Sequence, residues 1–212
     1  MSQSSRVLKF VGHFCASFAL SATLVANSHA SPVLMVDASG KLTGATGVNV
    51  GGVLYDVSFL DGSCPSLFSG CDSPADDFAF TDASTADAAS QALLDQVFID
   101  VGSSMFDSDS EATLGCNSVL SCTAVTPYGT GSNNAFFASG ARNFSLAEGV
   151  DLVIEVSGLS LINTADFSNF TFAEWRISAA VPEPSSLALL GVAGIALGWS
   201  QRRRQVLGTR RS

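Results

Sequence analysis

Short runs of β-branched and aromatic residues, set off by glycine and polar residues, recur through the central part of this 212-residue chain. In the run 53–59, Val53, Tyr55, Val57 and Phe59 alternate with the other positions, which is the period of a strand with one buried face. Runs of the same kind lie at 33–37, 46–50, 78–80, 123–128, 134–139, 142–146, 151–157 and 170–178. The pattern predicts a domain built mostly of strands.

One segment has a different period. In residues 83–98, Ala86, Ala89, Leu93 and Val97 recur at helical spacing and would share one face. Asp82 or Ser84 precedes this face in the position of an N-cap. We therefore expect one amphipathic helix packed on a sheet.

The central elements predict one domain over residues 31–180, because no repeat of solenoid length and no linker divides them. Its expected class is mainly β (α+β), an antiparallel β-sandwich-like domain with one packed helix. The two ends of the chain follow other patterns.

Residues 1–30 have the order of a secretory signal peptide. Arg6 and Lys9 precede an apolar stretch, and small residues then lead to an expected cleavage between Ala30 and Ser31. The alternative, an N-terminal membrane anchor, fits less well because His13 and several serines interrupt a short apolar stretch. The chain is thus expected to be exported.

The C-terminal segment 185–200 contains sixteen residues without a charge. As a helix it would be about 24 Å long, shorter than a ~30 Å hydrocarbon core, so a buried core helix is the alternative. Arg202, Arg203 and Arg204 follow at once, and this basic flank favours a transmembrane helix with a cytoplasmic tail at 205–212.

Pro182, Glu183 and Pro184 stand immediately before this span. Proline resists helical conformation and biases the preceding residue towards an extended one, so the segment should stay accessible. The order of Pro-Glu-Pro, apolar span and arginine cluster over 181–204 resembles the PEP-CTERM sorting signal of Gram-negative bacteria. The resemblance implies export, a transient stay in the inner membrane, cleavage by an exosortase and an association with exopolysaccharide. The expected processing partners are signal peptidase and exosortase.

The charge of the chain is unevenly distributed. All 19 acidic residues lie in 31–184, against Lys41, Arg142 and Arg176 as basic residues, so this region has a formal net charge of −16, compared with −9 for the whole chain. Nucleic acids and anionic lipids require basic patches, so we expect no nucleic-acid partner.

Four cysteines remain after the expected signal cleavage: Cys64, Cys71, Cys116 and Cys122. An even number in an exported chain predicts two disulfides, although three pairings are possible. The short spacings favour the local pairs 64–71 and 116–122.

The sequence offers little for catalysis. His13 and His29 are the only histidines and both precede the expected cleavage, which removes Ser-His-Asp chemistry and imidazole metal sites. No phosphate-binding glycine motif is present, and no pair of carboxylates stands out. We expect no enzyme and no cofactor.

An acidic segment containing Asp107, Asp109 and Glu111 resembles the start of a calcium loop. The EF-hand pattern fails, because its sixth position is Ala112 and its twelfth is Ser118. A solvated acidic loop is the favoured interpretation.

Two hypotheses follow. The first is a non-catalytic surface or extracellular-matrix protein associated with exopolysaccharide. The alternative is a glycan-binding module, with or without calcium, in which Tyr128 would stack on a sugar ring.

Overall fold

The computed structural model describes residues 31–179 apart from 72–77, 132–134, 146–150 and 160. The strands are β1 (Val33–Val36), β2 (Leu42–Val50), β3 (Val53–Leu60), β4 (Asp100–Val101), β5 (Ser104–Met105), β6 (Ser121–Thr130), β7 (Ala135–Phe144), β8 (Leu152–Leu159) and β9 (Phe170–Ile177). The helices are α1 (Cys64–Leu67) and α2 (Ala83–Gln96), with short 3-10 turns η1 (Ser69–Cys71), η2 (Ser110–Ala112) and η4 (Thr164–Asp166).

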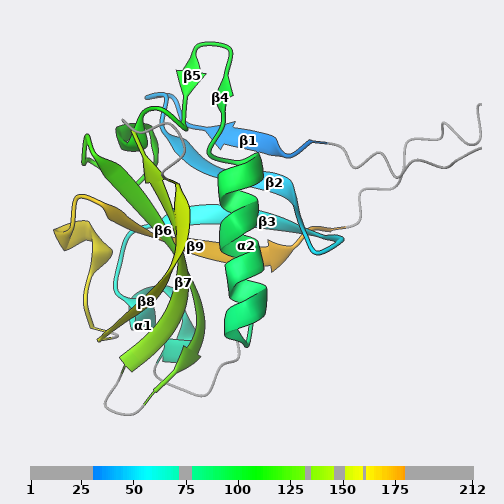
Figure 1. The fold of residues 1–212 in the computed structure, drawn as a ribbon. Coiled ribbons are helices and arrows are strands. Elements are labelled where there is room, and N and C mark those ends of the chain that lie inside the picture. Colours follow the sequence, from blue (N-terminus) through cyan, green and yellow to red (C-terminus); the bar gives the residue numbers. More distant parts are fainter. Residues whose placement is uncertain (1–30, 72–77, 132–134, 146–150, 160, 180–212) are drawn as a thin grey trace, which may run out of the picture.

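Seven of these strands form one sheet in the order β1-β2-β3-β9-β6-β7-β8, and β4 and β5 form a separate hairpin. Neighbours in the sheet are antiparallel except β6 and β9, which run parallel. In Figure 1, β1, β2, β3 and β9 run across the view, whereas β6, β7 and β8 run roughly up and down. The mainly β prediction is confirmed.

The expected antiparallel sandwich is corrected to one strongly bent mixed sheet. The parallel pair arises because the chain leaves the edge strand β8 and returns as β9 in the middle of the sheet, between β3 and β6. An alternating pattern shows which face of a strand is buried but not which strand it joins, so this pairing left no mark in the sequence.

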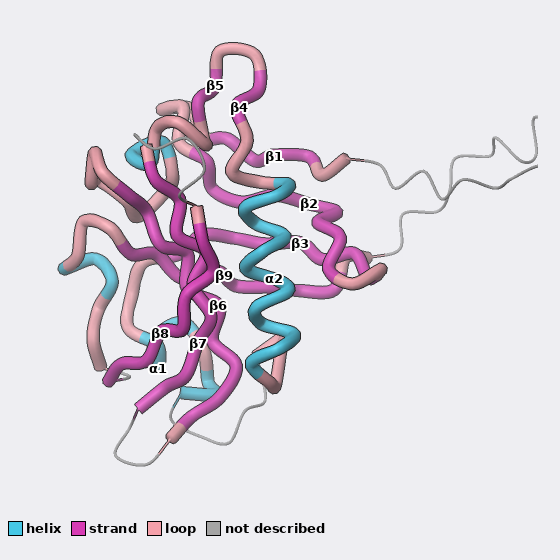
Figure 2. The backbone as a smooth tube through the Cα atoms, in the orientation of Figure 1, coloured by secondary structure: helices cyan, strands magenta, loops and turns pink. Residues whose placement is uncertain are grey.

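Helix α2 packs on one face of the sheet, as Figure 2 shows. The Asp82 carboxylate accepts a hydrogen bond from the Thr85 backbone N–H at 3.0 Å, so Asp82 is the N-cap. Ala86, Ala89 and Leu93 are fully buried, as their spacing predicted.

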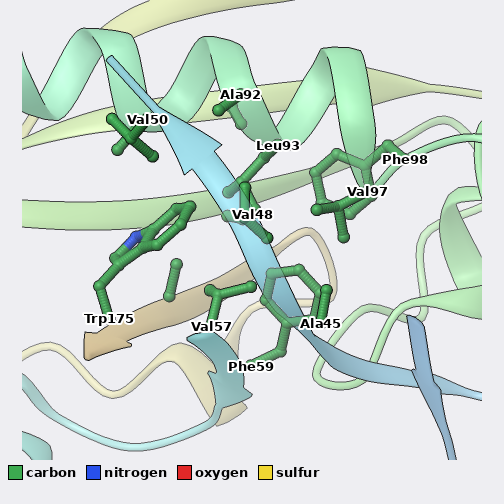
Figure 3. Close-up of a cluster of buried hydrophobic side chains, with 14 of the residues drawn as sticks. Ala45, Val48, Val50, Val57, Phe59, Ala92, Leu93, Val97, Phe98 and Trp175 are labelled. Carbon is green, nitrogen blue, oxygen red and sulfur yellow. The ribbon is translucent and has the colours of Figure 1, made fainter. Parts of the chain in front are cut away.

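The larger core lies between α2 and the sheet. Figure 3 shows Phe59 of β3 beside Phe98, which follows α2, and their rings stack with centroids 5.6 Å apart. Trp175 of β9 belongs to the same buried cluster, and its indole N–H donates to the Thr126 hydroxyl at 3.0 Å. Satisfying this buried donor makes it possible to bury the large ring.

A second core lies on the other face. Phe68, Phe136 and Phe172 pack there with Cys64 and Cys71. The sheet is therefore buried on both sides, but only one side is covered by the long helix.

Two predicted strands were too short because glycines suggested breaks. A Cβ on Gly44 would lie 2.1 Å from the Val57 carbonyl oxygen, and one on Gly140 would lie 2.8 Å from Val156 Cγ2. Both glycines instead allow close strand packing inside β2 and β7, so 134–139 and 142–146 are parts of one strand.

The predicted strand at 78–80 is wrong, since these residues form an irregular segment. Phe78 and Phe80 are nevertheless buried, one in each core. The two aromatic side chains that suggested a strand are buried in the cores, and their backbone is not part of a sheet.

Candidate functional site

The predicted sorting and cleavage residues lie outside the part of the chain that the structure describes. They are Ala30 on the N-terminal side, with Pro182, Glu183, Pro184, Arg202, Arg203 and Arg204 on the C-terminal side. Ser31, the expected first residue after cleavage, precedes β1. The predicted span 185–200 is also outside, and within the described ranges no helix is long and apolar enough to cross a membrane.

The cysteines form the two local pairs that their spacing favoured. Cys64 pairs with Cys71 and Cys116 with Cys122, with Cα atoms 5.6 and 5.7 Å apart. All four side chains are buried. The first pair closes the loop that carries Phe68 into the second core, and the second fixes the entry into β6.

The carboxylates of Asp100 and Asp109 accept hydrogen bonds from residues of the acidic segment. The Asp100 carboxylate accepts hydrogen bonds from the Asp107 and Ser108 backbone N–H groups and from the Ser108 hydroxyl at 2.7 Å. The Ser108 hydroxyl bond is the main cause of the lowered pKa of Asp100. Asp109 accepts from the Glu111 N–H and begins η2.

No group of three or more His, Cys, Asp or Glu side chains is placed to hold a metal ion among the residues described. The sequence has a further acidic pair, Asp76 and Asp77, in the segment 72–77, which is outside the described residues. The structure thus adds nothing in favour of calcium at Asp107, Asp109 and Glu111.

Asp151 has the opposite behaviour to Asp100. Burial, followed by the charge of Asp107 and a hydrogen bond to it, raises the pKa of Asp151 above its ordinary value of 3.8. A hydrogen bond from the Phe144 N–H to Oδ1 at 2.8 Å partly opposes this rise. The surroundings of Asp151 thus favour its protonated form.

Lys41 has a structural role. Its ammonium group donates to the backbone carbonyls of Glu111 and Cys116, the latter at 3.1 Å. The side chain joins the turn before β2 to the acidic segment and to the second disulfide.

A pocket of about 240 Å³ lies between the N-terminal part of α2 and the strands β6, β7 and β8. Its lining residues are Ala83, Asp87, Tyr128, Ala138, Val153, Ile154 and Glu155. Burial, then the charges of Glu155 and Asp87, raises the pKa of Tyr128. This pocket combines one aromatic hydroxyl with two carboxylates.

Tyr128 was singled out by the sequence, and it lies in β6, which includes the predicted strand 123–128. Its ring stacks on Phe137 of β7 with centroids 6.5 Å apart. Asp87 and Glu155 were missed. Glu155 carried a weak signal as a charge inside the apolar run 151–157, whereas Asp87 reads as one more polar residue of a helix.

A second pocket of about 170 Å³ lies on the opposite face, under the connection from β8 to β9. Its lining residues are Val125, Phe136, Val156, Ser157, Gly158, Ile162, Thr164, Phe167, Phe170 and Phe172. The Thr164 hydroxyl is already bound to Asp61 and Gly62, so the free surface of this pocket is apolar.

Comparison with known families finds a match at the C-terminal end of the chain. The family model of the PEP-CTERM protein-sorting motif matches residues 180–204. The chain therefore carries a PEP-CTERM sorting motif, as its C-terminal residues predicted, and the motif implies export, a membrane-associated sorting signal and processing by an exosortase. No curated protein and no solved structure matches the chain.

Proposed function

We propose that residues 31–180 form a non-catalytic domain that is delivered to the cell surface or extracellular matrix and associates there with exopolysaccharide. The observation that carries the proposal is the sorting motif at 180–204, which begins directly after the last strand, β9. A folded domain followed at once by such a signal is a cargo for export.

The composition of the domain supports this fate. Two buried disulfides suit an oxidising compartment outside the cytoplasm. The net charge of −16 over 31–184 favours solubility in a hydrated polysaccharide matrix. Lys41, the only lysine in residues 31–184, is occupied by two carbonyls and is unavailable as a catalytic base.

The proposal is tested by replacing the motif in the native host. In the triple variant Pro182→Ala, Glu183→Ala, Pro184→Ala, the protein should stay in the membrane fraction, while the wild type reaches the surface and medium. Thr209→Ala, in the tail outside the motif, is the matched control and should behave like the wild type. Immunoblots of separated fractions provide the measurement, and a triple variant found in the medium at the wild-type level would contradict the proposal.

A glycan-binding module is the second candidate, and the pocket around Tyr128 favours it. Sugars bind through stacking on an aromatic ring and through hydroxyl groups that donate to carboxylates, and Tyr128 lies with Asp87 and Glu155 in one pocket. In this candidate the acidic pair accepts sugar hydroxyls, directly or with calcium.

The glycan candidate predicts that Tyr128→Ala weakens retention of the host's exopolysaccharide. Loss of one aromatic contact of about 1 kcal/mol should reduce affinity by about fivefold. Phe167→Ala is the control, because Phe167 is an aromatic residue of the opposite pocket and is 45% exposed. Co-sedimentation with and without a calcium chelator measures the effect, and equal retention by both variants and the wild type would exclude this pocket as a sugar site.

A further inference from the structure

Strand β8 forms one edge of the seven-stranded sheet. It pairs with β7 over its whole length, from Leu152 opposite Arg142 to Leu159 opposite Ala135, and no described strand pairs with its other side. In an antiparallel ladder every second residue of an edge strand points its N–H and C=O outwards. Such an edge is a template for a further strand.

The two faces of β8 lead to two different pockets. Glu155 lies opposite Ser139 on the face covered by α2, and its neighbour Val156 lies opposite Ala138 on the other face. Glu155 lines the pocket that contains Tyr128, while Val156 lines the apolar pocket and packs against the second core. Adjacent residues of one edge strand thus border sites of contrasting chemistry.

The pocket on the helix side is suited to a cation. Asp87 and Glu155 provide two carboxylates there, and the ion pair found among the described residues involves neither of them, since it joins Arg176 to Glu174. The three basic side chains of the described domain are engaged elsewhere: Lys41 binds carbonyls, Arg142 bonds to Thr123 and Arg176 pairs with Glu174. The pocket on the other face is lined by phenylalanine rings and suits an aliphatic side chain.

We propose that the free edge of β8 is a docking site for an extended peptide of another exported protein in which basic and apolar residues alternate. The peptide adds to β8 as an eighth strand, with a lysine or arginine beside Glu155 and an adjacent aliphatic residue beside Val156. Main-chain hydrogen bonds supply affinity, and the alternate side chains in the two pockets supply specificity.

Charge decides against a second copy of this chain as the occupant. A copy offers two edge strands: β1 is entirely apolar, and β8 contains Glu155 and no basic residue, so neither offers a cation to Glu155. Two domains that each carry a net charge of −16 over 31–184 would also repel one another on approach. A basic, alternating peptide matches both the charge of the domain and the two faces of the edge.

The test uses the full chain in detergent, so that it does not depend on whether exosortase processing occurs. A fluorescent nine-residue peptide of alternating lysine and valine, with blocked termini, is titrated and followed by fluorescence anisotropy. Two control peptides contain the same numbers of lysines and valines. One groups the lysines and valines in blocks, and the other carries N-methyl groups on every second backbone nitrogen, which removes the N–H donors of one strand edge. We expect binding of the alternating peptide and at least about tenfold weaker binding of both controls.

Variants of the protein test the acidic pocket. Glu155→Gln and Asp87→Asn should each weaken binding of the alternating peptide by about fivefold and reduce its dependence on salt. Asp95→Asn makes the same change of charge on α2 outside the pocket and should bind like the wild type. Hydrogen exchange of the wild-type protein should show new protection of the amides in 152–159 when the peptide binds.

Equal binding of the alternating and block peptides would overturn the proposal, because simple attraction between opposite charges explains that result. Unchanged binding of the N-methylated peptide would exclude strand addition. Concentration-dependent dimers that the peptide dissociates would show that a second copy occupies β8. Absence of any binding at millimolar peptide would also refute the site.

Discussion

Asp107 and Asp151 show how a pair of like charges is held in place by its surroundings. Asp151 is kept partly out of solvent and fixed by the Phe144 N–H, and Asp107 lies against it. Since burial and the neighbouring charge raise the pKa of Asp151, the folded protein binds its proton more tightly than the unfolded chain does. The contact therefore destabilises the fold once both groups are ionised.

A pH dependence of stability follows from this pair. With the folded pKa raised above 3.8, the free energy of unfolding should fall as the pH rises from that value through the raised pKa. Asp151→Asn should abolish this part of the fall, because the amide oxygen can still accept from Phe144 and its NH₂ group can donate to Asp107. At pH 7 the variant should be more stable by about 0.5 kcal/mol, a small value because solvent screens a partly exposed pair.

Chemical denaturation at a series of pH values measures this effect. Asp166→Asn, an exposed carboxylate of η4, serves as the control and should keep the wild-type slope. An Asp151→Asn protein with the wild-type slope would show that the Asp107–Asp151 contact has no influence on stability.

At the scale of elements, α2 could be predicted in detail. Its buried face follows from the spacing of Ala86, Ala89 and Leu93, and its start follows from the polar residues at 82–84. Both signals are local, because the residues that reveal the helix in the sequence are the same residues that pack against the sheet and cap the helix. The structure decides between the two possible caps in favour of Asp82.

The helix cap gives a test within this element. Asp82→Ala should lower Tm by about 3 °C, because the Thr85 N–H loses its partner at the helix start. Ser84→Ala, at the other position that the sequence allowed, should leave Tm unchanged or slightly higher. Thermal unfolding followed by circular dichroism measures both, and a larger loss for Ser84→Ala would show that the cap has been misassigned.

The positions of the strands could be predicted from the sequence more readily than their order in the sheet. Alternation in 53–59 correctly placed Tyr55, Val57 and Phe59 on the core side, whereas Val53 at the start of the strand is 45% exposed. The parallel contact of β6 with β9 depends on residues far apart in the chain and left no periodic signal. Glycines were misread because their use in close packing is visible only when the neighbouring strand is known.

The candidate site shows the same limit. Tyr128 could be selected because the sequence contains few aromatic residues able to stack on a sugar. Its two acidic neighbours come from α2 and from β8, and only the fold brings those elements to one pocket. The cysteine pairs could be favoured from spacing because each pair closes a short loop.

At the scale of the whole molecule, the described domain and the sorting motif are consecutive units. In Figure 1, β9 ends on the right, while β8 lies on the left of α2. Strand β8 is thus on a different side of α2 from the end of β9. A domain held through its C-terminal end would leave this edge accessible to a partner.

The central claim is that the chain is an exported cargo that is cut at its C-terminal motif, and intact-mass analysis tests it most directly. Protein from the native host should have the mass of Ser31 to about Pro184, less two hydrogen atoms for each of the two disulfides. A host without the exosortase should yield a larger species that retains 185–212. If the mass in both strains still includes Arg202, Arg203 and Arg204, the protein is permanently anchored and the account of its sorting is wrong.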